Sequence, residues 1–158
     1  MRKLIILAGI PGTGKSFFAR KELKEKNMVV VSSDEVRFQM THDYRKILSN
    51  MNVVYDRMIE IANEHFEKND DITVVLDSTF LTDERRNYFL DRIKNADSVE
   101  LILLKVHNEQ MIFVRNHRRI RAKWVPEDVL VDMMKKYSFP SDENLNRYTS
   151  IRVVYTDE

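Results

Sequence analysis

The chain has 158 residues, 43% of them hydrophobic, which suits one compact domain with a buried core and leaves too little chain for two ordinary domains. Its 26 basic and 25 acidic residues give a net charge of +1, so no overall field requires a polyanionic partner. The lack of cysteine excludes disulfides and thiolate metal sites, and no stretch approaches the roughly 18 apolar residues of a membrane span, so we expect a cytoplasmic chain with no membrane partner.

The chain begins with a predicted strand, loop and helix in succession. Lys3 to Ala8 is a short apolar run, as in a buried strand, and Ser16 to Lys26 has helical spacing. Between them the sequence GIPGTGKS matches the phosphate-loop (P-loop) pattern G-x-x-x-x-G-K-[ST] at every fixed position and holds all 3 glycines of the chain. Backbone N–H groups that glycine leaves accessible form an anion cradle with the helix N-terminus. The motif predicts a site for ATP, or another nucleoside triphosphate, with Mg²⁺.

Residues of this loop have separate expected roles. Lys15 should reach the β- and γ-phosphates, and the Ser16 hydroxyl should ligate Mg²⁺. The competing interpretation is a glycine-rich turn without a ligand, but the strand and helix on either side favour the phosphate site. The residues expected to bind ATP here are Gly9, Pro11, Gly12, Thr13, Gly14, Lys15, Ser16 and Phe17.

Four further apolar runs alternate with longer helical segments. This alternation predicts βαβ units and a mainly parallel five-stranded sheet covered by helices on both faces, a three-layer α/β sandwich of the P-loop NTPase type. We find no internal repeat and no linker, so residues 1–158 are expected to form a single domain. The further strands are predicted at Met28 to Val31, Ile72 to Leu76, Val99 to Val106 and Ile151 to Tyr155.

Helical segments can be assigned from spacing and from their first residues. Apolar residues three and four apart over Tyr44 to Lys68 predict one long amphipathic helix or two shorter ones. Thr82, followed by two acidic residues, is a candidate N-cap. Pro126 is expected at the first helical position before the helix over Val129 to Tyr137.

Acidic residues follow the second and third predicted strands, where an α/β sheet places its ligands. Ser32 and Glu35 form a capping-box pattern, and Asp34 and Arg37 share a face of the helix that follows. Asp34 could accept a proton from an acceptor hydroxyl while Arg37 holds an acceptor phosphate, although ordinary first-turn charge pairing would also explain them. Asp77 is placed to orient Mg²⁺, through water, or else to cap a turn.

A strongly basic stretch runs from Arg115 to Lys123, with no acidic residue between Glu109 and Glu127. Such a stretch is often a solvated face or a nucleic-acid patch. After the fourth strand of a P-loop domain it could instead be a helical lid, over about 115–125, that carries arginine to the transferring phosphoryl group.

Taken together, these segments resemble a known family. GIPGTGKS, SSDEVR, LDSTFLTDERR, VRNHRR and VPEDVL occur in the order found in the P-loop kinase domain of polynucleotide 5′-hydroxyl kinases, such as phage and bacterial end-healing enzymes. The resemblance implies ATP-dependent transfer of the γ-phosphate to the 5′-hydroxyl end of DNA or RNA, in the host cytoplasm for a phage-encoded chain. It also implies residue roles: Asp34 is the general base, Arg37 and Thr79 contact the acceptor, and Arg119, with Arg115 nearby, stabilises the donor phosphates.

The chain departs from the family pattern at two places. Phe80 stands where family members often carry Asn, so a polar contact near the acceptor or metal is expected to be missing. The spacing between Arg115 and Pro126 is about one residue looser, which leaves Arg118, Arg119 and Arg121 as alternatives for the phosphate contact. No Asp-x-Asp phosphatase motif occurs, so we expect a kinase alone.

Two other functions are compatible with these motifs. The acceptor could be a hydroxyl on a small metabolite, an aminoacyl-tRNA or a modified DNA base, because related P-loop kinases share the Asp and the lid arginines. Alternatively, the chain could be a nucleotide-hydrolysing switch. The missing Asn-Lys-x-Asp guanine motif and the paired Asp34 and Arg37 disfavour a switch. The motifs leave the oligomeric state open.

Overall fold

Five parallel strands form the centre of the structure, a computed structural model that describes residues 1–43 and 50–157. The order across the sheet is β2-β3-β1-β4-β5, and every neighbouring pair is parallel. All five predicted strands are confirmed, and their observed ends agree with the predicted ends to within two residues. The strands are β1 (Arg2–Ala8), β2 (Met28–Ser32), β3 (Ile72–Asp77), β4 (Ser98–Lys105) and β5 (Ser150–Tyr155).

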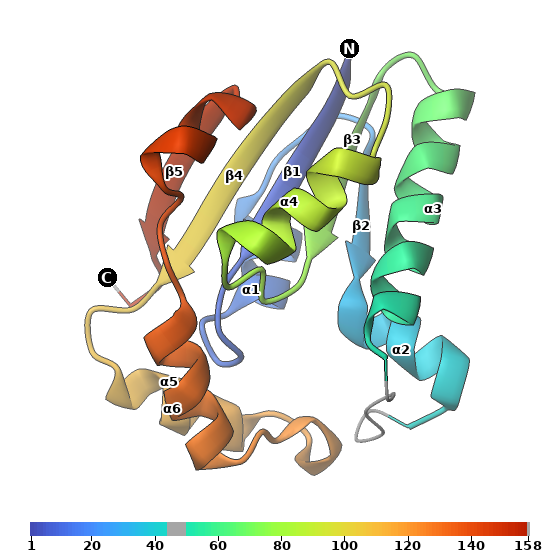
Figure 1. The fold of residues 1–158 in the computed structure, drawn as a ribbon. Helices are drawn as coiled ribbons and strands as arrows, with labels where there is room; N and C mark the ends of the chain where they lie inside the picture. The colour runs from blue at the N-terminus through green and yellow to red at the C-terminus, as the bar shows by residue number, and fades with distance from the viewer. Residues whose placement is uncertain (44–49, 158) are drawn as a thin grey trace.

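Helices lie on both faces of the sheet, which confirms the predicted three-layer α/β class (Figure 1). The first helix, α1, is followed directly by a π-helical turn, η1, on one face, while α3 and α4 cover the other. Two short 3₁₀ helices, η2 and η3, complete the set. The bounds are α1 (Lys15–Phe17), η1 (Phe18–Glu22), α2 (Ser33–Thr41), α3 (Asn52–Lys68), α4 (Asp83–Arg92), α5 (Gln110–Arg118), η2 (Arg121–Lys123), α6 (Glu127–Lys136) and η3 (Asp142–Arg147).

Alternate residues of β1 face opposite sides of the sheet and enter separate cores. Leu4 and Ile6 belong to the larger core beneath α3 and α4, whereas Ile5 and Leu7 pack with Phe18 of η1. All four β1 side chains are buried, as expected for a strand covered on both sides. A third apolar cluster, around Ile10, Ile112 and Leu130, joins the P-loop to α5 and α6.

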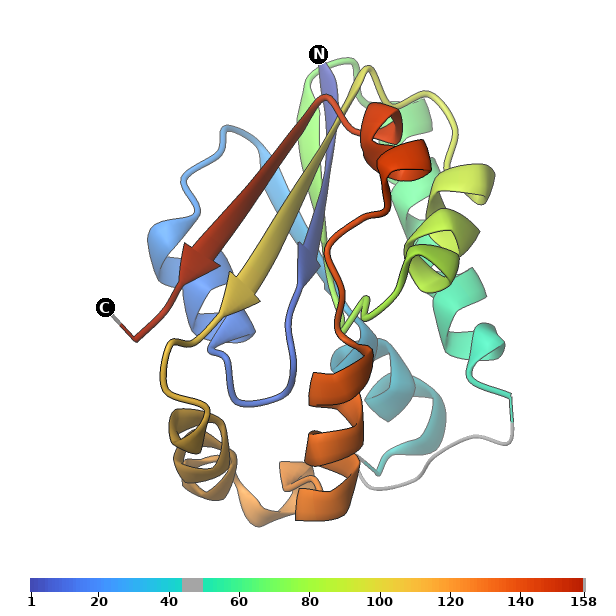
Figure 2. The same cartoon turned by 60° about the vertical axis from the view of Figure 1, so that its left-hand side comes forward.

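The carboxyl ends of the strands all point toward the end of the sheet where α2, α5 and α6 lie (Figure 2). The hydroxyl of Tyr137, just after α6, donates hydrogen bonds to the backbone carbonyls of Ala8 and Leu104 at 3.3 and 2.9 Å. This links α6 to the ends of β1 and β4, and burial raises the pKa of the Tyr137 hydroxyl. The loops that follow the strands are therefore gathered at one edge.

Two helix predictions need correction, and a third is confirmed from Asn52 onward. The helix expected over Ser16 to Lys26 ends at Glu22, because Leu23 turns into an extended conformation and is buried in the core. Pro126 is the N-cap of α6 and not its first residue, since its ψ of 143° is extended. The segment expected over Tyr44 to Lys68 is helical as α3 from Asn52, and its residues 44–49 lie outside the described residues. The Thr82 N-cap is confirmed: its side chain accepts from the Arg85 N–H.

Candidate functional site

The P-loop backbone adopts conformations that require glycine at two positions. Gly12 and Gly14 have φ of 96° and 87°, which is the left-handed region. A Cβ on Gly12 would also lie 2.6 Å from the backbone oxygen of Ile112, so α5 packs directly against the loop. Thr13 is buried, and its hydroxyl donates to the Ile10 carbonyl at 2.7 Å, which closes the loop from within. A Cβ on Gly9 would lie 2.6 Å from that hydroxyl.

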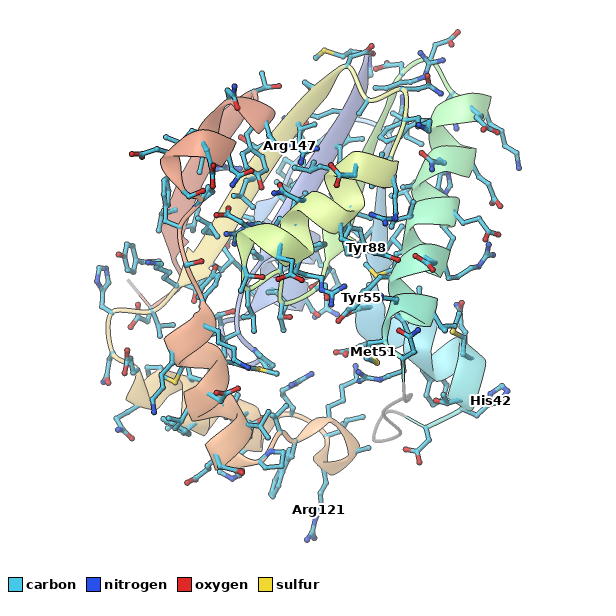
Figure 3. All side chains as sticks on the ribbon, viewed as in Figure 1. His42, Met51, Tyr55, Tyr88, Arg121 and Arg147 are labelled. Carbon is cyan, nitrogen blue, oxygen red and sulfur yellow. The ribbon has the colours of Figure 1, made fainter. Side chains whose placement is uncertain are left out.

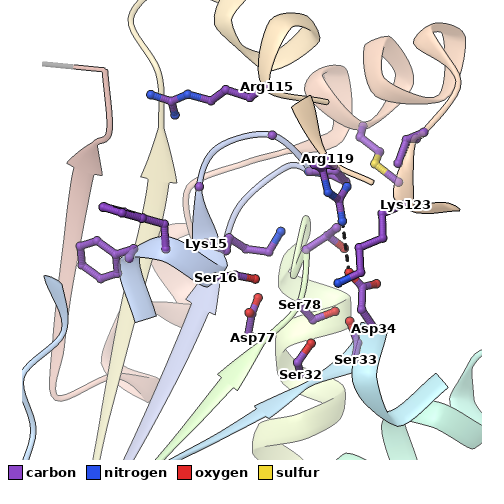
Figure 4. A pocket seen from close by; sticks show the side chains of 18 of the residues that line it. Lys15, Ser16, Ser32, Ser33, Asp34, Asp77, Ser78, Arg115, Arg119 and Lys123 are labelled. Carbon is purple, nitrogen blue, oxygen red and sulfur yellow. Dashed lines mark hydrogen bonds and ion pairs between the residues drawn. The ribbon is translucent and has the colours of Figure 1, made fainter. Parts of the chain in front are cut away.

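A cavity of about 1390 Å³ lies over this loop at the carboxyl end of the sheet (Figure 4). Ligand pockets usually hold about 300–1,000 Å³, so the space exceeds what one small ligand needs. Gly9 and Thr13, both expected to bind ATP, support the loop from behind and do not line the cavity. The residues predicted for the site that do line it are Pro11, Gly12, Gly14, Lys15, Ser16, Phe17, Asp34, Arg37, Asp77, Thr79, Arg115 and Arg119.

Lys15, Ser16 and Asp77 converge at the base of the cavity (Figure 4). Asp77 ends β3, where it pairs in register with Leu7 of β1, and only 5% of its surface is exposed. Burial raises the pKa of the Asp77 carboxyl, and the charge of Lys15 opposes that rise. Burial likewise lowers the pKa of Lys15, opposed by Asp77 and Asp34. Burying these two charged groups costs desolvation free energy. Strongly shifted pKa values of this kind are common at functional sites.

The donor set at this point fits Mg²⁺. Magnesium is usually held by one or two carboxylates together with substrate phosphates and waters. Asp77 supplies a carboxylate, and the Ser16 side chain lies beside it and lowers its pKa (Figure 4). Among the described residues no group of three or more His, Cys, Asp or Glu forms a candidate all-protein metal cage.

Asp34 lies across the cavity in the first turn of α2 and contacts two arginines. Its Oδ1 is 3.1 Å from Nη2 of Arg37, and its Oδ2 is 3.4 Å from Nη2 of Arg119. The helix begins here because the Ser32 side chain accepts from the Glu35 N–H at 3.5 Å, as the capping pattern predicts. The Asp34 carboxylate is 36% exposed and open to the cavity.

Thr79 and Phe80 follow β3 and diverge. Thr79 lines the cavity, and its carbonyl accepts from the Gly9 N–H at 3.2 Å. Phe80 is fully buried against Phe89, with ring centroids 4.8 Å apart, and its φ of 44° is left-handed. The buried Arg86 donates to the Phe80 carbonyl at 2.8 Å and holds this bend. The Phe80 ring fills the core, so this position gives the cavity no polar side chain.

The arginines of the basic stretch differ in whether they reach the cavity. Arg119 reaches the cavity beside Asp34, and Arg118 also lines it. The side chain of Arg121, the first residue of η2, points away from the molecule (Figure 3), and its guanidinium lies 5.7 Å from the Trp124 ring centroid. Of the three alternatives, only Arg118 and Arg119 therefore have access to a ligand in this cavity.

Arg115 lines the cavity but is anchored to the protein. Its Nη1 donates to the Thr13 carbonyl at 3.3 Å and to the Thr156 hydroxyl at 2.8 Å, and its Nη2 donates to the Thr156 carbonyl at 2.9 Å. Its guanidinium points away from Lys15 and Asp77 (Figure 4). Arg115 thus joins α5 to the P-loop and to the end of β5.

Several lining residues were not identified from the sequence. Lys123 lines the cavity, and its Nζ lies 3.8 Å from Oε1 of Glu35. Its place in the basic stretch was the sequence feature that could have identified it. Tyr55 of α3 and Met51, the N-cap residue of that helix, also line the cavity. Others come from α6 and β5, which are distant in sequence, and they include Val129, Met133 and Val154.

Comparison with protein families assigns the chain to one of them. Residues 4–140 match the model of a family described as an AAA domain. The chain belongs to this family. Its fold is that of the P-loop kinases, which implies nucleotide binding at the loop described above. Comparison with curated protein sequences finds no match. Within the described residues, no helix is both long enough and apolar enough to cross a membrane.

Solved structures with this fold differ in what they act on. A sugar kinase from a Janibacter species matches with a TM-score of 0.69 at 14% identity, over 100% of this chain and 87% of its own. Kti12 from Chaetomium thermophilum, in complex with ADP-AlF₃, matches with a TM-score of 0.66 at 16% identity, over 96% and 88%. A chain of the Pnkp1/Rnl/Hen1 RNA repair complex matches with a TM-score of 0.66 at 20% identity, over 86% of this chain but 44% of that one.

Proposed function

We propose that this protein is an ATP-dependent, Mg²⁺-dependent kinase that transfers the γ-phosphate to the 5′-hydroxyl end of a polynucleotide. The observation that carries the proposal is the position of Asp34. It lies in the same cavity as Lys15 and Ser16, yet on a separate element, and Arg119 of the basic stretch reaches it. A phosphate cradle and a candidate base on opposite sides of one cavity suit direct transfer between two bound substrates.

The donor half is built from the P-loop and the proposed lid, residues 115–125. The loop N–H groups and Lys15 bind the triphosphate, and Ser16 and Asp77 would hold Mg²⁺, which offsets charge on the phosphates when bound. Arg119 stabilises the charge that develops on the transferring group, and Arg118 is close enough to assist. Arg115, which lines the same cavity, orients the loop through its hydrogen bond to the Thr13 carbonyl.

The acceptor half is built from α2 and the loop after β3. Asp34 accepts the proton of the attacking hydroxyl, which then forms the new P–O bond as the bond to ADP breaks. Arg37 contacts the acceptor phosphate, a role for which its fixed fork of donors is suited, and Thr79 positions the acceptor from the facing loop. The volume of about 1390 Å³ supports two nucleotide-sized substrates in one cavity.

The alternative is another hydroxyl acceptor on the same machinery. The sugar kinase with this fold favours that alternative. The motif order of the chain, together with the Asp34 and Arg37 pair, favours the polynucleotide.

An acceptor screen with γ-labelled ATP tests the proposal. Single-stranded and duplex 5′-hydroxyl DNA and RNA, nucleoside 3′-monophosphates, sugars, sugar acids and aminoacyl-tRNA are offered in parallel. We expect label on 5′-hydroxyl ends and none on the same oligonucleotides carrying a 5′-phosphate. Label on a sugar alone would establish the alternative, and phosphate release without any labelled product would indicate a switch.

A further inference from the structure

A positively charged and aromatic strip lies beside the cavity, on the surface that α3 and α4 share. The Arg85 guanidinium of α4 lies 4.3 Å from the Tyr55 ring centroid and 5.6 Å from that of Tyr88. Its Nη1 donates to Oδ1 of Asn52 at 3.0 Å. Farther along α4, the Arg92 guanidinium lies 3.8 Å from the Tyr88 centroid. We call these four side chains, Arg85, Tyr55, Tyr88 and Arg92, the Arg-Tyr strip.

The charge of Arg85 is fixed in place without a carboxylate. In the part of the chain that the structure describes, Arg85 takes part in no ion pair, whereas Arg37 and Arg119 each pair with Asp34. Its contacts are two aromatic faces and a neutral amide, which hold the guanidinium but leave its charge uncompensated. One carboxylate contacts the strip: Asp56 accepts a hydrogen bond from the Tyr88 hydroxyl, not from Arg85. A held and uncompensated arginine suits an anionic ligand.

The strip begins at the cavity and leads away from it. Tyr55 lines the cavity together with Met51, the N-cap residue of α3. Figure 3 shows Met51, Tyr55 and Tyr88 in succession along α3 and α4, from the cavity outward. Arg85, Tyr88 and Arg92 are spaced three and four apart and so share one face of α4. At about 1.5 Å per residue the strip extends for about 10 Å along that helix.

We propose that the Arg-Tyr strip binds the single-stranded polynucleotide just beyond its 5′-terminal nucleotide. The inference rests on the proposed function and adds the substrate's extent: an acceptor longer than one nucleotide. Arg85 contacts the next phosphate, and bases stack on the outward faces of the Arg85 and Arg92 guanidinium groups, which the tyrosine rings hold flat from beneath. Backbone charge contacts with base stacking are the combination that binds single strands without sequence preference. With a stacked rise of about 3.4 Å, the length of about 10 Å accommodates about three nucleotides.

A comparison of acceptor lengths tests this. Arg85→Ala and Arg92→Ala are assayed with a short single-stranded 5′-hydroxyl oligonucleotide and with a nucleoside 3′-monophosphate. Arg57→Ala is the matched control, because Arg57 lies on α3 but is paired with Glu60. We expect Arg85→Ala to raise the oligonucleotide KM about tenfold, with kcat and the mononucleotide KM unchanged. Arg92→Ala should raise KM less, and only for the oligonucleotide, while Arg57→Ala should change neither.

A binding measurement without catalysis distinguishes failure of the strip proposal from failure of the proposed function. Fluorescence anisotropy of the oligonucleotide across salt concentrations should give a slope shallower by about 0.7 for Arg85→Ala than for the wild type, because one phosphate contact is lost. Two results would overturn the proposed binding role of the strip. One is an equal loss of affinity for the mononucleotide and the oligonucleotide. The other is an unchanged oligonucleotide KM in both strip variants when their unfolding midpoints match the wild type. A wild-type protein that phosphorylates no 5′-hydroxyl end of any length would instead overturn the proposed function.

Discussion

Nη2 of Arg119 lies 3.4 Å from Oδ2 of Asp34, although the two residues are 85 positions apart in the chain. One belongs to the proposed lid and the other to the proposed acceptor half, so the ion pair crosses the cavity. The proposed function assigns Arg119 to the donor phosphates and Asp34 to the acceptor hydroxyl. Nucleotide binding would then exchange the carboxylate partner of Arg119 for phosphate and leave Oδ2 of Asp34 free to accept a proton, while Oδ1 stays beside Arg37.

The first prediction follows from that exchange and uses the single tryptophan of the chain, Trp124. Its indole N–H donates to the Arg119 carbonyl at 2.9 Å. Movement of Arg119 toward bound phosphates should therefore change the surroundings of Trp124. We expect a shift of its emission when Mg²⁺ and a non-hydrolysable ATP analogue are added together. Lys15→Ala, which removes the phosphate contact, should show no shift, and an unresponsive wild type that binds the analogue would contradict the exchange.

The second prediction concerns the base. Asp34→Asn keeps the size of the side chain but cannot accept the proton, so transfer to the proposed acceptor should fall about 10²–10⁴-fold in kcat. Affinity for the nucleotide, measured by calorimetry, should stay close to that of the wild type. Asp70→Asn is the matched control, since the side chain of Asp70 is 99% exposed beside the start of β3. Near-normal transfer by Asp34→Asn would show that another group takes the proton.

The third prediction is a pH dependence of stability caused by Asp77. Burial raises the pKa of this carboxyl above 3.8, so as the pH increases the unfolded chain releases the proton before the folded chain does. The folded state then binds more protons than the unfolded state, and Asp77 makes the free energy of unfolding fall with rising pH by at most about 1.4 kcal/mol per pH unit, until the raised pKa is passed. Urea unfolding of the ligand-free protein, compared with Asp77→Asn, isolates this contribution.

Mg²⁺ and nucleotide should reverse that trend, because a cation at Ser16 and Asp77 favours the ionised carboxylate. The wild type should gain more stability from Mg²⁺ with nucleotide at higher pH, and Asp77→Asn should gain less. An equal gain in stability in the two proteins would show that Asp77 does not hold Mg²⁺.

The fourth prediction compares two glycines of the P-loop. A Cβ at Gly14 would meet nothing closer than Nη1 of Arg115 at 3.7 Å, so Gly14→Ala should cost about 1–2 kcal/mol for its left-handed backbone alone. A Cβ at Gly12 would also press on the Ile112 carbonyl at 2.6 Å, which belongs to helical backbone and cannot give way cheaply. Gly12→Ala should therefore destabilise more than Gly14→Ala in thermal unfolding. The reverse order would mean that α5 does not pack on the loop as described.

Local sequence was sufficient for the strands, for the P-loop and for the contact between Asp34 and Arg37. Apolar runs bounded by turns give parallel strands whatever their order, and the fixed spacing of GIPGTGKS determines which groups a phosphate meets. Asp34 and Arg37 are three residues apart on one helix, so their 3.1 Å contact is local as well. The end of the first helix was misjudged because burial of Leu23, a long-range effect, overrode helical spacing.

Tertiary structure alone decided which side chains meet across the cavity. The family resemblance pointed to Arg119 but left Arg118 and Arg121 as alternatives. Only the path of the chain after α5 directs Arg121 outward and Arg119 to Asp34. In the same way, pairing of β3 beside β1 brings Asp77 to Lys15, and packing of α3 on α4 creates the Arg85 and Tyr55 contact. Sequence spacing determines neighbours within an element, whereas contacts between elements depend on burial of the whole core, which no short motif encodes.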